Sequence, residues 1–233
     1  MAGLKDILAE EVKLFERDKL WAGGFCQQKT PENLEIVNRC IKSYAGNKSA
    51  LEIGPGRGFW TNEILRHKPK QITCIDALSS EHNCFWEYVG VQNQNRVRYH
   101  QVKNFDCAEI EDNSIDYLFS YDVFCHISFY GINAYMTALK SKIRSGSDCF
   151  VMIADRERYQ KSSAWERPMA REKIMRSMSL PDERISTDPS RFHFIGIERF
   201  ALILGKNGFS IVNNDVTADL FNVTSPVVHF RRL

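Results

Sequence analysis

Short apolar runs alternate with longer helix-like segments through the first two thirds of this 233-residue chain. Most of these runs are near-continuously hydrophobic, which is typical of strands that a parallel sheet buries on both faces. The segments between the runs are long enough for the crossover helices that parallel strands require. The pattern predicts a doubly wound α/β fold. The five runs are SALEIG (49–54), QITCIDA (71–77), VRYHQV (97–102), SIDYLFSY (114–121) and DCFVMIAD (148–155).

Further elements flank this region on both sides. Apolar residues recur at helical spacing near the N-terminus, and a second helix is predicted from the N-cap Thr30 and Pro31 to near Gly46. No Pro/Gly/Ser-rich linker divides the chain, so residues 1–233 are interpreted as one domain. The predicted C-terminal elements are a helix in IGIERFALILGKNGF (195–209) and strands in SIVNNDV (210–216) and SPVVHFRRL (225–233).

Residues 156–194 interrupt the alternation of strands and helices. This segment is charged and contains no apolar run of strand length. It follows the fifth strand candidate, so it would pass over the carboxyl edge of the sheet, where open α/β folds bind their ligands. We therefore expect a helical lid over a binding site.

Composition limits the classes of protein to which the chain can belong. With 31 Lys and Arg against 29 Asp and Glu the net charge is only +2, and without a long basic block no nucleic-acid partner is expected. Charges interrupt the N-terminal stretch, which disfavours a signal peptide or a membrane span there. The seven cysteines are scattered without a C-x-x-C pair, which disfavours disulfides and a zinc site. A cytoplasmic protein with reduced cysteines is expected.

The stretch ALEIGPGRGFW places Gly54, Gly56 and Gly58 between a strand and a helix. Glycine lets the backbone approach a ligand closely or adopt a positive φ. Dinucleotide enzymes use G-x-G-x-x-G and hold a pyrophosphate at the helix N-terminus. Here the carboxylate of Glu52, two residues before the first glycine, would repel a pyrophosphate. Asp76 ends the second strand candidate, where an acid can accept hydrogen bonds from both hydroxyls of a ribose, so an adenosine-bearing ligand without phosphates is expected.

These features resemble the cofactor motifs of the class I S-adenosylmethionine-dependent methyltransferases. LEIGPGRG is similar to their glycine motif, CIDA to their ribose motif, and EDNSIDYLFSYDVFCHIS to the segment that contains their fourth strand. The matches follow the family's order over residues of about 48–155, and the chain looks most like the members that O-methylate small molecules or sugars. The resemblance implies a seven-stranded, Rossmann-like sheet with an antiparallel last strand. It also implies S-adenosylmethionine as the cofactor and S-adenosylhomocysteine as its product.

The resemblance implies roles for individual residues as well. Most members have an acid facing the adenine amine where this chain has Asn104, followed by Phe105, and Asp106 competes for that role. Tyr121 and Trp21 are further expected cofactor contacts. The remaining expected contacts are Gly54, Gly56 and Gly58 at the amino-acid moiety, Glu52 on the loop and the ligand amine, Asp76 on the ribose, and Ala77 near the adenine.

The same resemblance directs attention to the end of the fourth strand candidate for catalysis. Methyl transfer is an in-line displacement, so the protein must align the acceptor and, for a hydroxyl, remove its proton. Asp122 and His126 lie four residues apart there, and both would face the methyl group in this fold. His126 is the leading proton acceptor, because imidazole titrates near neutral pH. It could instead pack under the cofactor, and His193 and His229 are further candidates.

Asp155 ends the fifth strand candidate and is a third catalytic candidate. Together with Asp122 it could supply oxygen ligands to a magnesium or similar ion, as in some members that methylate catechols or sugars. Their fifth-strand acid is usually followed by Asn or Asp, whereas Arg156 follows here. The expectation is therefore no metal, with the Asp122 and Asp155 pair as the alternative.

Residues 1–28 are the second lid candidate. FERDKLWAGGF places Phe15, Trp21 and Phe25 around a pair of glycines. Such a segment can fold over a cofactor and exclude water. A helix that only caps the sheet edge is the alternative interpretation.

The acceptor is the least determined part of the prediction. The balanced charge disfavours a long nucleic acid, and SYDVF replaces the N-P-P-Y-like run of enzymes that methylate planar nitrogens. A hydroxyl on a small molecule, in particular a sugar in a glycan or its precursor, is expected by resemblance. N-methylation of a metabolite or protein, and a non-catalytic cofactor-binding module, remain alternatives. The oligomeric state stays open. Residues of the 156–194 segment that could bind a polar acceptor are Arg158, Trp165, Arg167, Arg171 and Arg191.

Overall fold

The computed structural model describes residues 4–17, 29–168, 171–172, 175 and 192–233. Within these residues, seven strands form one sheet in the order β3-β2-β1-β4-β5-β7-β6. The strands β3, β2, β1, β4 and β5 pair in parallel, and β7 is antiparallel to both β5 and β6. The predicted doubly wound sheet with an antiparallel last strand is confirmed. The bounds are β1 Ser49–Ile53, β2 Gln71–Asp76, β3 Val97–Gln101, β4 Ile115–Ser120, β5 Ile143–Met152, β6 Phe209–Asn213 and β7 Val227–Arg232.

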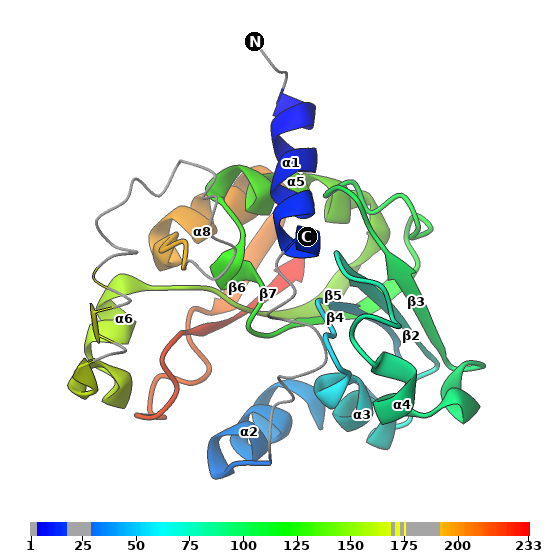
Figure 1. Ribbon diagram of the computed structural model, residues 1–233, viewed down its shortest axis with the longest axis horizontal. Coiled ribbons are helices and arrows are strands. Elements are labelled where there is room, and N and C mark those ends of the chain that lie inside the picture. The colour runs from blue at the N-terminus through cyan, green and yellow to red at the C-terminus, as the bar shows by residue number, and fades with distance from the viewer. Residues whose placement is uncertain (1–3, 18–28, 169–170, 173–174, 176–191) are drawn as a thin grey trace.

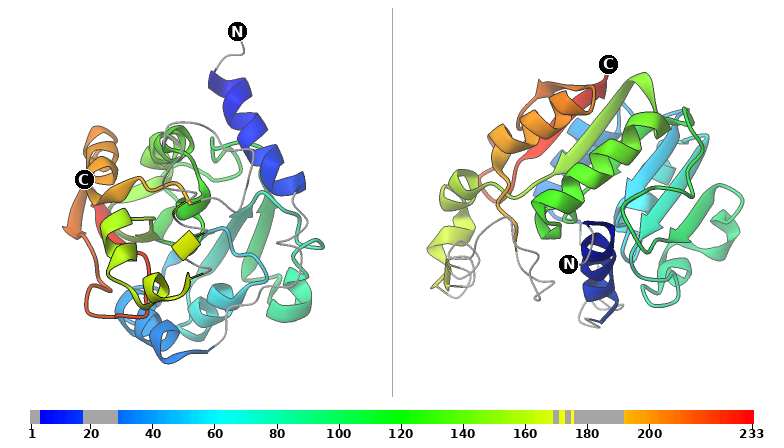
Figure 2. Two further views of the ribbon diagram at one scale, coloured as in Figure 1. Left: turned by 60° about the vertical axis from the view of Figure 1, so that its left-hand side comes forward. Right: turned by 90° about the horizontal axis from the view of Figure 1, so that it is seen from above.

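Helices cover both faces of the sheet (Figure 1). On one face lie α1 (Leu4–Arg17), α5 (Phe129–Lys142) and α8 (Gly196–Lys206), and the view from above in Figure 2 shows α1 beside α5. On the other face lie α2 (Pro31–Ile36), α3 (Phe59–Arg66) and α4 (Phe85–Val89). The short helix α6 (Arg156–Gln160) follows β5. None of the helices in the described ranges is long and apolar enough to cross a membrane.

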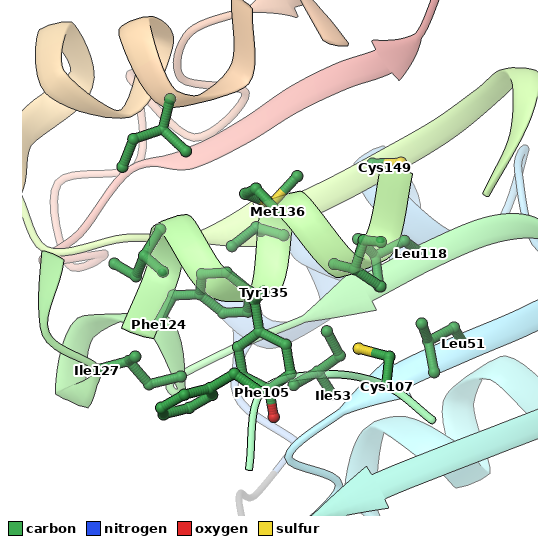
Figure 3. Close-up of a cluster of buried hydrophobic side chains, with 14 of the residues drawn as sticks. Leu51, Ile53, Phe105, Cys107, Leu118, Phe124, Ile127, Tyr135, Met136 and Cys149 are labelled. Atoms are coloured by element: carbon green, nitrogen blue, oxygen red, sulfur yellow. The ribbon is translucent and has the colours of Figure 1, made fainter. Parts of the chain in front are cut away.

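The sheet separates two hydrophobic cores. Leu51 and Ile53 of β1 belong to the core under α5, whereas Ala50 belongs to the core under α3. Figure 3 shows Tyr135 and Met136 of α5 over the sheet in the first of these cores. Because successive strand residues point to opposite faces, burial on both faces requires apolar residues at nearly every position. This requirement explains why the strands were visible as continuous apolar runs.

Two elements differ from the sequence expectation. β5 begins at Ile143, before the predicted run 148–155. The prediction missed this start because the residues directly after Ile143 are exposed and give no apolar signal. The predicted second helix begins as expected, since the Thr30 hydroxyl accepts a hydrogen bond from the N–H of Asn33 at 3.2 Å. It then changes at Val37–Ile41 into a π-helical segment, in which the N–H of Lys42 donates to the carbonyl of Val37 at 2.9 Å.

A buried carboxylate attaches α1 to the start of α5. Glu11 is only 3% exposed, and its two oxygens accept from the backbone N–H and the hydroxyl of Ser128 at 2.6 and 2.7 Å. The Ser128 hydroxyl in turn accepts from the N–H of Gly131 and so caps α5. A negative charge at a helix N-terminus is favourable, although burial raises the pKa of Glu11. Glu11 therefore holds α1 against the first turn of α5.

Within the predicted lid 156–194, the described residues contain α6 and a 3-10 turn at Ser163–Glu166. Residues 169–170, 173–174 and 176–191 lie outside the described residues. The segment returns at the carboxyl edge of the sheet, where the N–H of His193 donates to the carbonyl of Cys125 at 2.7 Å. Both of its described ends therefore lie next to strand ends, and closure over a ligand stays a prediction.

Replacing Glu11 tests the attachment of α1. We expect Glu11→Ala to lower the free energy of unfolding by about 1–3 kcal/mol, because it leaves the buried N–H of Ser128 without its acceptor. Urea denaturation measures the change. Glu10→Ala is the control, since Glu10 is exposed on the same helix and forms a surface ion pair with Lys13. Equal losses in the two variants would contradict the anchoring role of Glu11.

Candidate functional site

A cavity lies at the carboxyl edge of the sheet, beyond the ends of β1, β2 and β4. β1 leads into α3 on one face and β4 into α5 on the other, so the cavity lies at a switch point of the topology. The space free of protein atoms in and around it, part of it open to solvent, is about 1120 Å³. The predicted residues that line it are Gly54, Gly56, Asp76, Ala77, Phe105, Tyr121, Asp122 and His126.

The three loop glycines serve different purposes. Gly54 has φ 69°, and a Cβ there would lie 2.2 Å from Cγ2 of Val123 in the segment after β4. Gly56 has φ 52°, and a Cβ there would meet no atom within 4 Å, so its backbone is open to the cavity. Gly58 does not line the cavity; its missing Cβ leaves room for Val89 of α4 at 2.3 Å. Gly54 and Gly56 thus form a bare backbone cradle.

Asp76 connects this loop with the end of β2. Its Oδ2 accepts from the N–H of Gly56 at 3.1 Å, and its Oδ1 accepts from the N–H of Leu78 at 2.9 Å. Each carboxylate oxygen has two lone pairs, so acceptor capacity remains for two ligand hydroxyls. Burial raises the pKa of Asp76 to about 6. The arrangement leaves room for a ribose beside Ala77, and the contacts of Asp76 and Ala77 with a cofactor stay predictions.

Glu52 lies beneath the loop and does not line the cavity. It is 1% exposed, and its Oε2 accepts from the Thr61 hydroxyl of α3 at 2.6 Å. Its Oε1 has no hydrogen-bond partner among the described residues. Burial raises the pKa of Glu52 to about 7. The carboxylate therefore fixes α3 to β1 under the loop, and its predicted contact with a ligand amine stays a prediction.

The segment after β3 contributes an aromatic wall. Phe105 lines the cavity and meets Tyr135 of α5 edge-on at 4.8 Å between ring centroids. Figure 3 shows both rings next to Ile53 and Ile127. Asn104 and Asp106 are exposed and lie outside the lining, and the Asn104 side-chain oxygen accepts from the N–H of Asp106 at 2.9 Å. The structure thus brings Phe105 to the site and leaves the adenine contact of Asn104 a prediction.

Asp122 and His126 meet at the cavity. Asp122 has φ 61°, an uncommon conformation for a residue other than glycine and one that clusters at functional sites. A 3-10 turn at Phe124–His126 returns the chain, so that Nε2 of His126 lies 3.9 Å from Oδ1 of Asp122. The imidazole is 9% exposed and stacks on Phe192 at 5.0 Å. A base and an acid therefore lie together at the cavity, with the imidazole buried and the carboxylate partly exposed.

Asp155 lies outside the lining and caps α6 instead. Its Oδ1 accepts from the N–H of Arg158 at 2.8 Å, and its Oδ2 from the N–H of Ile197 at 3.4 Å. Both its catalytic role and its metal-binding role beside Asp122 stay predictions. In the described part of the chain, one group of three potential metal ligands is Asp122, Cys125 and His126. Burial raises the pKa of the Cys125 thiol well above its usual value, which disfavours a thiolate ligand there.

The two other candidate histidines do not line the cavity. His193 is 3% exposed, and its backbone is hydrogen-bonded to Cys125. His229 on β7 stacks on Phe150 at 4.2 Å, and its Nε2 lies 2.7 Å from Oδ1 of Asp148. Burial lowers the pKa of His229. These contacts give His229 a structural role in the sheet.

Several lining residues were not predicted. Trp60 of α3 meets Tyr121 at 4.9 Å, and Val12 of α1 and Tyr135 of α5 complete the apolar walls. The helical periodicity of the N-terminal segment included Val12, but it could not show which turn would reach the site. Trp21, the remaining expected cofactor contact, lies outside the described residues, as do Phe25 and the two glycines before it.

The chain is similar to a known protein family in sequence and to solved structures in fold. The family model described as "Methyltransferase domain" matches residues 26–214. An S-adenosylmethionine-dependent methyltransferase from Mesorhizobium loti is 12% identical, with a TM-score of 0.60 over 88% of this chain and 99% of that one. Magnesium protoporphyrin IX methyltransferase from Synechocystis, solved with bound S-adenosylhomocysteine, is 14% identical, with a TM-score of 0.60 over 99% and 100% of the two chains.

An O-methyltransferase family protein from Burkholderia thailandensis is 11% identical, with a TM-score of 0.57 over 86% of this chain and 53% of that one. At these identities the similarity concerns the fold. No curated protein sequence matches the chain.

The ionisation of Asp76 predicts a pH dependence of ligand binding. We expect the affinity for S-adenosylhomocysteine to fall about tenfold per pH unit below about pH 6, because protonation removes an acceptor that the ribose requires. Asp76→Asn should bind about 10- to 100-fold more weakly than the wild type and lose this pH dependence. Isothermal titration calorimetry measures both effects. Asp106→Asn is the matched control; if it lost affinity while Asp76→Asn did not, the ribose assignment would be wrong.

Glu52 predicts a pH dependence of stability. Its pKa rises from 4.5 to about 7 on folding, so the folded protein binds the extra proton and stability falls as the pH rises through this window. Glu52→Gln has no such titration. Its free energy of unfolding relative to that of the wild type should therefore rise by about 3 kcal/mol from about pH 4 to about pH 8. Chemical denaturation at both pH values tests this, with exposed Glu87→Gln as the control. A pH-independent difference between Glu52→Gln and the wild type would contradict the assignment.

Proposed function

The chain belongs to the methyltransferase domain family, and we propose that it transfers a methyl group from S-adenosylmethionine to a hydroxyl group of a small molecule. The single observation that carries this proposal is the shared cavity. The glycine loop and Asp76 form one part of its lining, and Asp122 and His126 form another part. A cofactor site and a proton acceptor thus open into the same space.

The cavity fits the adenosyl cofactor by its own chemistry. The backbone of Gly56 leaves room for a ligand where a side chain would stand, since a Cβ there would meet no atom within 4 Å. Asp76 offers acceptors to a ribose, and Phe105 offers an apolar face to an adenine. When bound there, S-adenosylmethionine supplies an electrophilic methyl group on a sulfonium.

The residues around this group would align the acceptor and manage its proton. We propose that the imidazole of His126 accepts the proton of the acceptor hydroxyl. The carboxylate of Asp122, 3.9 Å from Nε2, would favour the imidazolium that forms. Phe192 stacks on the imidazole ring and shields one of its faces.

For the acceptor we propose a sugar, free or within a glycan or its precursor. The balance of 31 basic and 29 acidic residues supports a neutral polar acceptor over a nucleic acid. The likeness in fold to an O-methyltransferase family protein supports a hydroxyl as the target. The six described cysteines are free, which supports the cytoplasmic location that we propose.

We also propose that residues 1–28 act as a lid. Val12 of α1 lines the cavity, and Glu11 fixes the same helical turn to α5. The N-terminal helix is thus part of the binding site in addition to covering the sheet.

An acceptor screen tests the proposed function. Purified protein is incubated with methyl-labelled S-adenosylmethionine and a panel of sugars, glycan fragments, phenols, amines and RNA, with and without a chelator. Label in an ether bond to a sugar is the expected result. Label only on amines or RNA would contradict O-methylation, and no label on any acceptor despite cofactor binding would favour a non-catalytic module. Loss of turnover with the chelator would assign a metal to the Asp122 region.

His126 predicts a separation of turnover from binding. We expect His126→Asn to lower kcat about 100-fold or more, while the affinity for S-adenosylhomocysteine changes less than about threefold, because the imidazole acts on the acceptor proton. Initial rates on the acceptor found in the screen and calorimetry measure the two quantities. His67→Asn, outside the cavity, is the control. A parallel loss of binding and turnover would instead show that His126 only packs under the cofactor.

A further inference from the structure

A second pocket lies next to the cofactor cavity, and Tyr121 lines both. Three segments far apart in the sequence surround it: the start of α2, the turn after α6, and the loop between β6 and β7. Figure 1 shows that loop beside α2 and α6. We call this second pocket the polar pocket. Because Tyr121 directly follows β4, the polar pocket reaches the start of the segment that contains Asp122 and His126.

The chemistry of the polar pocket differs from that of the cofactor cavity. Hydroxyl and amide side chains dominate its lining, including Thr30, Ser163, Asn222 and Thr224, with one acid and one base. Such groups donate and accept hydrogen bonds without a net charge, as the hydroxyls of a saccharide require. The ring of Tyr121 adds an apolar surface on which the C–H face of a sugar can rest. A phosphate-rich or strongly cationic ligand would find no matching cluster of charges in this lining.

Arginines hold one wall of the polar pocket in place. Arg39 Nη2 donates to Asp219 Oδ2 at 2.9 Å, and Arg39 Nη1 donates to the carbonyl of Val216 at 2.9 Å. Arg158 Nη2 donates to the carbonyl of Leu220 at 2.7 Å. These bonds attach the β6–β7 loop to the helices on both sides.

The pocket residues themselves continue this attachment. Asn222 Nδ2 donates to Glu32 Oε1 at 2.7 Å and so joins the loop to the start of α2. The N–H of Ser163 donates to the carbonyl of Phe221 at 3.4 Å and joins it to the turn after α6. A ligand would therefore meet a lining that is already ordered, which reduces the entropic cost of binding.

We infer that the polar pocket is the acceptor site and that it binds a neutral saccharide ring, whose reactive hydroxyl passes Tyr121 to reach the cofactor cavity. This inference rests on the proposed function and adds the acceptor subsite to it. It assigns recognition of the acceptor to Thr30, Ser163, Asn222 and Thr224, residues that the sequence motifs did not indicate.

Saturation-transfer NMR tests the inference. Protein saturated with S-adenosylhomocysteine is mixed with methyl glycosides of common hexoses, and saturation transfer to the ring protons is measured. We expect a signal with the wild type, and a dissociation constant about five- to tenfold higher for Asn222→Ala and for Thr224→Val. Ser163→Ala should weaken binding as well. Ser163 lies on the turn after α6, so its effect would show that weaker binding does not come only from a loosened β6–β7 loop. Asn214→Ala is the matched control, an exposed residue of the same loop outside the pocket.

The outcomes separate this inference from the proposed function. Absence of glycoside binding to the wild type, or equal binding to the wild type and all three pocket variants, would overturn the acceptor site. If the protein nevertheless transfers label to a phenol, O-methylation stands and only the polar pocket falls. If glycosides bind as expected but receive no label, the pocket stands and the proposed transfer fails. Thermal melts and S-adenosylhomocysteine affinity verify that each variant is folded.

Discussion

The whole site depends on the close approach of the β1 loop to the segment after β4. A Cβ at Gly54 would lie 2.2 Å from Cγ2 of Val123, and the φ of 69° excludes most other residues. Any side chain at Gly54 would force the two segments apart. Their contact places Asp76, tied to the loop through the N–H of Gly56, in the same cavity as Asp122. The absence of one methyl group thus keeps the cofactor cradle and the proposed catalytic groups together.

The sequence predicted those parts of the fold whose signals are local. Burial on both faces requires continuous apolar strands, so the parallel sheet was visible, and the glycine loop and Asp76 follow from backbone chemistry next to strand ends. The polar start of β5 at Ile143 and the wall formed by Val12 depend on tertiary pairing, which periodicity does not encode. Asn104 accepts a local hydrogen bond from the N–H of Asp106 in the structure, and its adenine contact stays a prediction.

Two pockets of different chemistry meet at Tyr121. The cofactor cavity has mostly apolar walls around the carboxylates of Asp76 and Asp122 and a bare backbone. The polar pocket has hydroxyl and amide side chains on segments held by Arg39 and Arg158. The cavity is built from the regular sheet and its strand ends. The polar pocket is built from loops, which vary more freely than the scaffold. This division accounts for a cofactor site that motifs indicate and a proposed acceptor site that they do not.

The central claim is that the glycine loop and Asp76 form a site for an adenosyl ligand without phosphates. Calorimetric titration of the folded wild-type protein with S-adenosylhomocysteine and, separately, with NAD tests it most directly. The geometry predicts saturable heat with S-adenosylhomocysteine and none with NAD, because a pyrophosphate at the loop would meet the carboxylate of Asp76. Saturable binding of NAD, together with no binding of S-adenosylhomocysteine, would contradict the account.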